Sequence, residues 1–197
     1  MFFVLQLGSC SGSDIPQGGR RGGNCGGTCA HGGHDVGFVP QQAACNDRHL
    51  CAGADLGDDP GHDAGKLAVV HIDLVDGLSS REIAVDSLNA LCHPDGIIST
   101  RPTLIRRARH RGLLTVQRAF ILDSLSLTSL SGQLEQGKPD FVEILPGIMP
   151  RVIAEISART QVPVIAGGLL RDKADVMAAM RAGAAAVSTS APGLWDV

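Results

Sequence analysis

From Lys66 to the C-terminus, short apolar runs alternate regularly with amphipathic stretches, and this alternation constrains the fold more than any other feature. Six runs rich in β-branched residues span residues 67–75, 95–101, 113–121, 141–147, 162–169 and 184–190. Their nearly continuous apolar cores are typical of parallel strands buried on both faces. Helical patterns follow at residues 79–91, 101–112, 124–137, 149–160 and 173–184. The sequence therefore predicts an α/β protein of six βα units with right-handed crossovers.

A closed TIM-type (β/α) barrel has eight strands, two more than these six runs supply. The apolar start MFFVLQLG lacks the basic n-region of a secretory signal, and we interpret it as a first β-strand. The predicted fold is thus a TIM-type (β/α) barrel, incomplete or disrupted at its N-terminus. An open six-stranded sheet is the alternative.

Residues 1–61 differ in composition from the rest of the chain, which places the expected boundary between an anomalous segment and a barrel-like domain at 62–197. Residues 1–65 hold 15 of the 25 glycines and five of the six cysteines, without sustained periodicity between Gly8 and Gly65. Three interpretations stay open: a glycine-rich disordered tail, an out-of-frame translation that recovers its frame near His62, or a zinc site. The zinc site would use Cys25, Cys29, His31 and His34, whose spacing is cramped for known zinc modules.

The last two predicted strands end in small residues suited to an anion. VPVIAGGL (162–169) ends in Gly167 and Gly168, and AAAVSTS (184–190) ends in three hydroxyl residues, Ser188, Thr189 and Ser190. Glycine lets the backbone approach a ligand closely, and hydroxyls add hydrogen-bond donors. Consecutive strand ends of this kind form phosphate sites on the C-terminal face of (β/α) barrels. We expect a small phosphorylated ligand there.

Charged side chains interrupt other apolar strands near the same end. Asp73 and Glu143 need a cation, a hydrogen-bond network or a ligand hydroxyl to be tolerated there. They suit either general acid–base catalysis or the hydroxyl groups of a polyol, and ion pairs with Arg101 or Arg118 are the structural alternative. His71 points to the same side of its strand as Asp73. His71 and Arg118 complete the candidate polyol-binding set.

Arginines are concentrated between Arg101 and Arg118, a stretch without any acidic residue. Two interpretations remain: a solvated outer helix, or contacts with the phosphate backbone of RNA. The candidate RNA-binding residues are Arg106, Arg107, Arg109 and Arg111.

Composition limits the remaining classes. A net charge of −3 gives no global attraction to nucleic acid, and the low aromatic content of 3% argues against base-stacking platforms. No apolar run of about 18 residues predicts a membrane span. We expect a cytoplasmic protein without a bound metal or cofactor, and a homo-oligomer stays open.

Six ordered motifs resemble the glycerol-3-phosphate-responsive antiterminators of bacterial glycerol operons, over roughly residues 62–197. The motifs are HIDLVDGL, DGIISTR, VQRAFILDS, PDFVEILPGIMP, PVIAGGLL and AGAAAVSTSAPGLW. The resemblance implies a TIM-type barrel that senses glycerol 3-phosphate, acts on leader mRNA to prevent premature transcription termination, and is not an enzyme. It also implies that Gly167, Gly168, Ser188, Thr189 and Ser190 hold the phosphate. Two alternatives remain: a phosphate-binding isomerase or lyase, and a non-functional frameshifted product.

Overall fold

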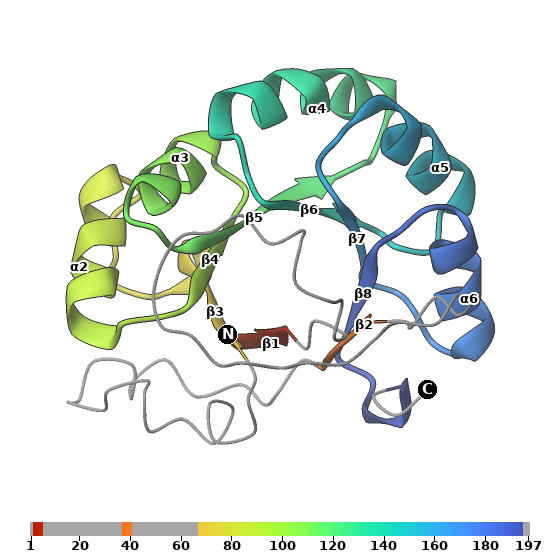
Figure 1. Ribbon diagram of the computed structural model, residues 1–197, viewed down its shortest axis with the longest axis horizontal. Helices are drawn as coiled ribbons and strands as arrows, with labels where there is room; N and C mark the ends of the chain where they lie inside the picture. Colours follow the sequence, from red (N-terminus) through yellow and green to blue (C-terminus); the bar gives the residue numbers. More distant parts are fainter. Residues whose placement is uncertain (1, 6–36, 41–66, 195–197) are drawn as a thin grey trace, which may run out of the picture.

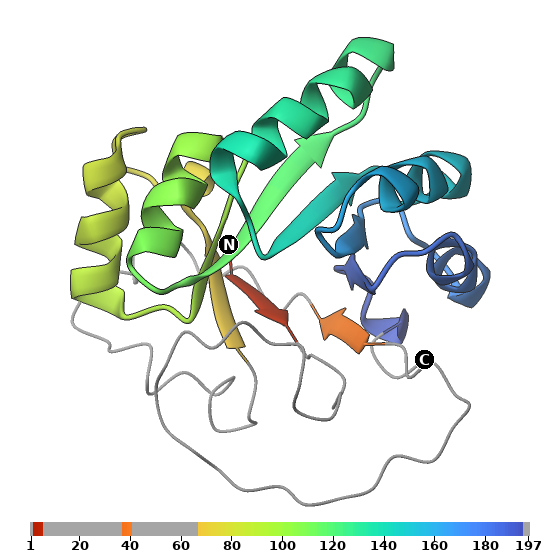
Figure 2. The same ribbon diagram turned by 45° about the horizontal axis from the view of Figure 1, so that its top comes forward.

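Six parallel strands alternate with helices in the computed structural model, which describes residues 2–5, 37–40 and 67–194 (Figures 1 and 2). Each predicted strand is confirmed, and each is shorter than its apolar run. The strands are β3 (Leu67–His71), β4 (Gly96–Ser99), β5 (Leu114–Phe120), β6 (Phe141–Leu145), β7 (Val164–Gly167) and β8 (Ala186–Thr189). The α/β, TIM-type fold class is therefore confirmed.

The helices cover the outside of the curved sheet (Figure 1). They are α2 (Glu82–Cys92), α3 (Pro102–His110), α4 (Ser124–Gly137), α5 (Pro150–Arg159) and α6 (Lys173–Arg181), with single 3₁₀ turns at Ile72–Leu74 and Pro192–Leu194. Local sequence sets their ends. The Asp123 side chain accepts a hydrogen bond from the Ser126 N–H at the start of α4, and Gly183, at φ +99°, follows α6.

Two short strands lie at the edges of the sheet. β1 (Phe2–Leu5) pairs antiparallel with β3, and β2 (Gly37–Pro40) pairs parallel with β8, which gives the order β1-β3-β4-β5-β6-β7-β8-β2. The expected N-terminal strand is confirmed. β2 lies where we saw no periodicity, and of its four residues only Phe38 and Val39 form an apolar run, between Gly37 and Pro40.

The edge strands also explain how this chain departs from a regular barrel. In a regular (β/α) barrel all strands are parallel and follow chain order, whereas here β1 runs opposite to β3 and β2 takes the place next to β8. β1 and β2 approach each other at the two edges of the sheet (Figure 1). No strand pairing joins them in the part of the chain that the structure describes.

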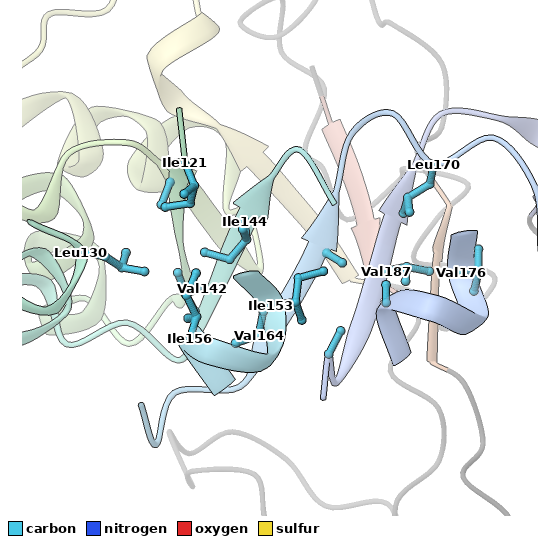
Figure 3. Packing of buried hydrophobic residues seen from close by; sticks show 14 of the residues in the cluster. Ile121, Leu130, Val142, Ile144, Ile153, Ile156, Val164, Leu170, Val176 and Val187 are labelled. Atoms are coloured by element: carbon cyan, nitrogen blue, oxygen red, sulfur yellow. The ribbon is translucent and has the colours of Figure 1, made fainter. Parts of the chain in front are cut away.

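Apolar side chains pack on both sides of the sheet. Between the sheet and helices α4 to α6, Val142, Ile144, Val164 and Val187 pack with Ile153 and their neighbours (Figure 3). A second cluster joins β3 and β4 to α2 and α3. The strands' other face holds a smaller cluster inside the curve of the sheet: Val69, Ile98, Val116, Ile165 and Ala186.

One helix presents a different face from the one its pattern predicts. We expected Ile83, Val85, Leu88 and Leu91 to supply the apolar positions of α2. The structure buries Val85 and Leu88, together with Ala84 and Cys92, and leaves Ile83 and Leu91 60% and 63% exposed. The helix starts at Glu82, and it packs the four buried side chains against β3, β4 and α3.

A pair of glycine substitutions tests this packing. A Cβ on Gly96 would lie 2.7 Å from the carbonyl oxygen of Leu114, whereas a Cβ on Gly132, within α4, would meet nothing within 4 Å. We expect Gly96→Ala to lower the free energy of unfolding by about 1–3 kcal/mol. Gly132→Ala should raise it by about 0.5–1 kcal/mol, because alanine favours the helix. Urea denaturation of both variants measures these changes; a Gly96→Ala variant as stable as wild type would contradict the close β4–β5 packing.

Candidate functional site

Polar residues form a layer at the C-terminal ends of the parallel strands, directly above the inner apolar cluster. Along a strand, alternate residues face the same side. Four strands of that cluster therefore carry a further residue on the same face, two positions after Val69, Val116, Ile165 and Ala186. These four residues and Glu143 of β6 form what we call the polar layer: His71, Arg118, Glu143, Gly167 and Ser188. The polar side chains of the layer are all buried.

An ion pair lies at the centre of the polar layer. The Arg118 Nε donates to Glu143 Oε2 at 2.6 Å, and the two side chains are only 9% and 3% exposed. The two residues are also direct neighbours across the β5–β6 ladder. The structural alternative, an internal ion pair with Arg118, is thus observed for Glu143. Because each charge compensates the other, both tolerate burial.

The glycines after β7 make room for this ion pair and for a neighbouring loop. A Cβ on Gly167 would lie 2.6 Å from Glu143 Oε1. The Gly147 N–H donates to the carbonyl oxygens of Gly167 and Gly168. Gly168 has φ +75°, a conformation that favours glycine. The turn and the position of Glu143 are therefore sufficient to explain both glycines.

Asp73 lies just outside the polar layer, on the 3₁₀ turn after β3. Its carboxylate accepts hydrogen bonds from the Ser99 hydroxyl at 2.9 Å, the Thr100 N–H at 2.6 Å and the Thr100 hydroxyl at 2.8 Å. These contacts join the loops after β3 and β4. Gln117 extends the connection, since its Nε2 donates to the Thr100 carbonyl at 2.9 Å.

His71 is buried between these groups, and its environment keeps it neutral. Burial and, secondarily, the positive charge of Arg118 lower its pKa from 6.5 to about 4, although the nearby Asp73 charge opposes this shift. His71 is therefore uncharged at neutral pH.

The three hydroxyl residues at the end of β8 have different surroundings. Ser188 pairs with Gly167 across the β7–β8 ladder and belongs to the polar layer. Thr189 points to the helix side, and its hydroxyl accepts from the Ala191 N–H at 3.1 Å. Ser190 is exposed. Gly167, Gly168 and Ser188 thus lie together, while the Thr189 side chain shapes the following turn.

The arginines of α3 lie on the outside of the protein, and each has a carboxylate partner. Arg107 contacts both oxygens of Asp86 at 3.0 and 2.6 Å, and Arg111 shares that carboxylate at 2.7 Å. The hydrogen bonds from Arg107 and Arg111 hold the pKa of Asp86 well below its usual range. Arg106 contacts Glu82 at 3.3 Å and Arg109 contacts Asp140 at 2.8 Å. The sequence did not reveal these partners, because they lie 21 to 31 residues away.

Exposed apolar side chains occur near the C-terminal ends of the strands, and we did not predict them. They are Leu74, Phe120, Leu122, Leu125, Ile148 and Leu169, which lie at the end of a strand or in the loop, 3₁₀ turn or helix start that follows it. Leu74, Phe120 and Leu169 fall within the predicted strands, where we expected them to be buried. Leu122, Leu125 and Ile148 fall outside the predicted strands.

Within residues 2–5, 37–40 and 67–194, no group of three or more His, Cys, Asp and Glu side chains could hold a metal ion. In the same residues no helix has the length and apolarity needed to cross a membrane. Cys25, Cys29, His31 and His34 lie outside the described residues.

Together, fold and polar layer define an α/β protein of the TIM-barrel type with its polar residues gathered at the C-terminal strand ends. A deoxyribose phosphate aldolase from Aeropyrum pernix shares this fold at 16% identity and a TM-score of 0.50.

Nearer relatives identify the family. The model of the glycerol-3-phosphate responsive antiterminator family matches residues 59–195. An uncharacterized Escherichia coli (strain K12) protein, YgcP, is 41% identical over 134 residues, which is 68% of this chain and 70% of YgcP. The glycerol uptake operon antiterminator regulatory protein of Listeria monocytogenes is 38% identical, with a TM-score of 0.66 over 69% of this chain and 74% of its own. A related Thermotoga maritima protein is 31% identical, with a TM-score of 0.63 over 83% and 88%. This chain belongs to the glycerol-3-phosphate responsive antiterminator family.

The buried His71 predicts how stability depends on pH. Since its pKa is lower in the folded state than the ordinary 6.5, the unfolded chain binds the proton more readily. Stability should therefore fall as the pH drops from about 6.5 towards 4. We expect His71→Gln to flatten the dependence of Tm on pH in this range, and His110→Gln, at the exposed end of α3, to leave it unchanged. An equally steep dependence in His71→Gln would show that another group is responsible.

Proposed function

We propose that this protein is a transcription antiterminator that responds to glycerol 3-phosphate and binds the leader mRNA of glycerol-utilisation genes. The observation that carries the proposal is the match of the family model to residues 59–195, which include the whole polar layer. The response to an effector would then occur at the C-terminal strand ends, and the protein would act in the cytoplasm, where leader RNA is transcribed.

The polar layer supports a phosphorylated polyol as effector. Gly167, Gly168 and Ser188 lie side by side and would hold the phosphate, with Ser190 at the exposed end of the same loop and Thr189 shaping its turn. Arg118 supplies a positive charge in a site of low exposure, where electrostatic attraction is strong. Glu143, His71 and Asp73 would face the glycerol hydroxyls.

The same contacts favour binding over catalysis. Glu143 is held by Arg118, and the Asp73 oxygens accept three hydrogen bonds from Ser99 and Thr100. These contacts already account for both carboxylates near the strand ends, so neither needs a catalytic role to explain its presence. This supports a regulator rather than the isomerase or lyase alternative, in which Asp73 and Glu143 would move protons.

Thermal denaturation with and without ligand tests the effector. We expect glycerol 3-phosphate at millimolar concentration to raise Tm, and glycerol to raise it much less, because ligand binding to the folded state stabilises it and the phosphate supplies most of the affinity. Ser188→Ala should reduce the shift, while Ser129→Ala, on the outer helix α4, should leave it unchanged. No shift for the wild-type chain would contradict the effector assignment.

Leader-RNA binding at different salt concentrations tests the contact surface. If the candidate RNA-binding arginines contact RNA, the RNA phosphates must displace Glu82, Asp86 and Asp140 as partners of the arginines. Replacing both Arg106 and Arg107 with alanine should then weaken binding and flatten the dependence of log K on log salt by about 2. A Glu82→Gln, Asp86→Asn control should strengthen binding, because it frees the same arginines. An unchanged slope in the arginine variant would exclude α3 from the RNA surface.

A further inference from the structure

Leu169 has a backbone conformation that leucine rarely adopts. In the described part of the chain, three residues other than glycine have positive φ: His93 at 45°, Lys138 at 50° and Leu169 at 61°. His93 and Lys138 are the C-caps of α2 and α4, where a left-handed residue ends a helix. Leu169 ends no helix. In this region its Cβ crowds the following carbonyl oxygen, so the position is strained for any residue with a side chain.

The neighbouring residues hold Leu169 in this conformation. On one side, the Gly147 N–H donates to the carbonyl oxygens of Gly167 and Gly168. On the other, the Leu170 side chain is 5% exposed and belongs to the core cluster that contains Val176 and Val187 (Figure 3). The chain must therefore turn between Gly168 and Leu170, and Leu169 cannot relax without disturbing one of these contacts.

The folded chain gains little from this side chain. Leu169 is 58% exposed, so most of its apolar surface stays in contact with water. A glycine would make the same turn without strain. Leu122 is even more exposed, at 82%, but it has no positive φ. The neighbouring contacts therefore explain why the chain turns here, but not why a leucine rather than a glycine stands at the turn.

We propose that Leu169 is an effector-contact residue. Leu169 directly follows Gly167 and Gly168, and Gly167 pairs with Ser188 across the β7–β8 ladder. From this position the Leu169 side chain packs against the carbon chain of a small phosphorylated polyol and shields the phosphate from water. This role rests on the proposed function, because it requires an effector at these strand ends. It explains why strain and exposure meet at one residue: the side chain becomes buried only when the effector is bound.

A Leu169→Gly variant separates these two effects. Its Tm without ligand should rise by about 1–3 °C, because relief of the left-handed strain exceeds the extra chain entropy of glycine. Its Kd for glycerol 3-phosphate, measured by isothermal titration calorimetry, should increase about fivefold or more, since the apolar contact is lost. The matched control, Leu122→Gly, should show neither a rise in Tm nor a change in Kd.

Each outcome bears on the proposal. A rise in Tm together with weaker binding supports it. If wild type binds and Leu169→Gly binds equally well, the contact role is overturned and the proposed function stands. If Leu169→Gly melts at a lower temperature than wild type, the strain argument is wrong and the inference falls. If wild type does not bind glycerol 3-phosphate at all, both the inference and the proposed function fail.

Discussion

Both faces of the parallel sheet are buried, and the arrangement of the other groups follows from this constraint. Helices cover the outside, and the strands' own side chains fill the inside of the curve. A charged group in the middle of such a strand would lose its hydration without compensation. The charged residues of β5 and β6, Arg118 and Glu143, accordingly compensate each other, and because all six strands are parallel, their C-terminal ends meet at one edge. The polar layer is the result.

Within this layer, the Arg118–Glu143 pair connects the adjacent strands. Glu143 fills the space where a side chain on Gly167 would lie, and the Gly147 N–H fixes the turn that follows Gly167. An anion that enters the layer meets a positive charge that already has a partner.

The arginine ion pairs on the outside of the protein are more exposed than the Arg118–Glu143 pair of the polar layer. Arg106, Arg107 and Arg109 of α3, with Arg111 just after it, looked like a nucleic-acid patch because no acid is near them in sequence. In three dimensions, α2 supplies Glu82 and Asp86, and Asp140 lies just before β6. Exposed ion pairs of this kind contribute little to stability. Their consequence is that the region carries less free positive charge than its sequence indicates.

The apolar pattern established the order and type of the elements from β3 to β8, because strands covered on both faces are largely apolar. It also placed Gly167, Gly168 and Ser188 at neighbouring strand ends, since parallel strands align their ends. It left open the direction of β1 and the position of β2, because the pairing partners of edge strands depend on which sheet edges are available. Three features emerged only from the folded structure: Thr189 faces the helices, Glu143 pairs with Arg118, and Leu169 is exposed in a left-handed conformation. These features depend on contacts between residues far apart in the chain and on backbone geometry that neighbouring loops impose, neither of which a linear pattern records.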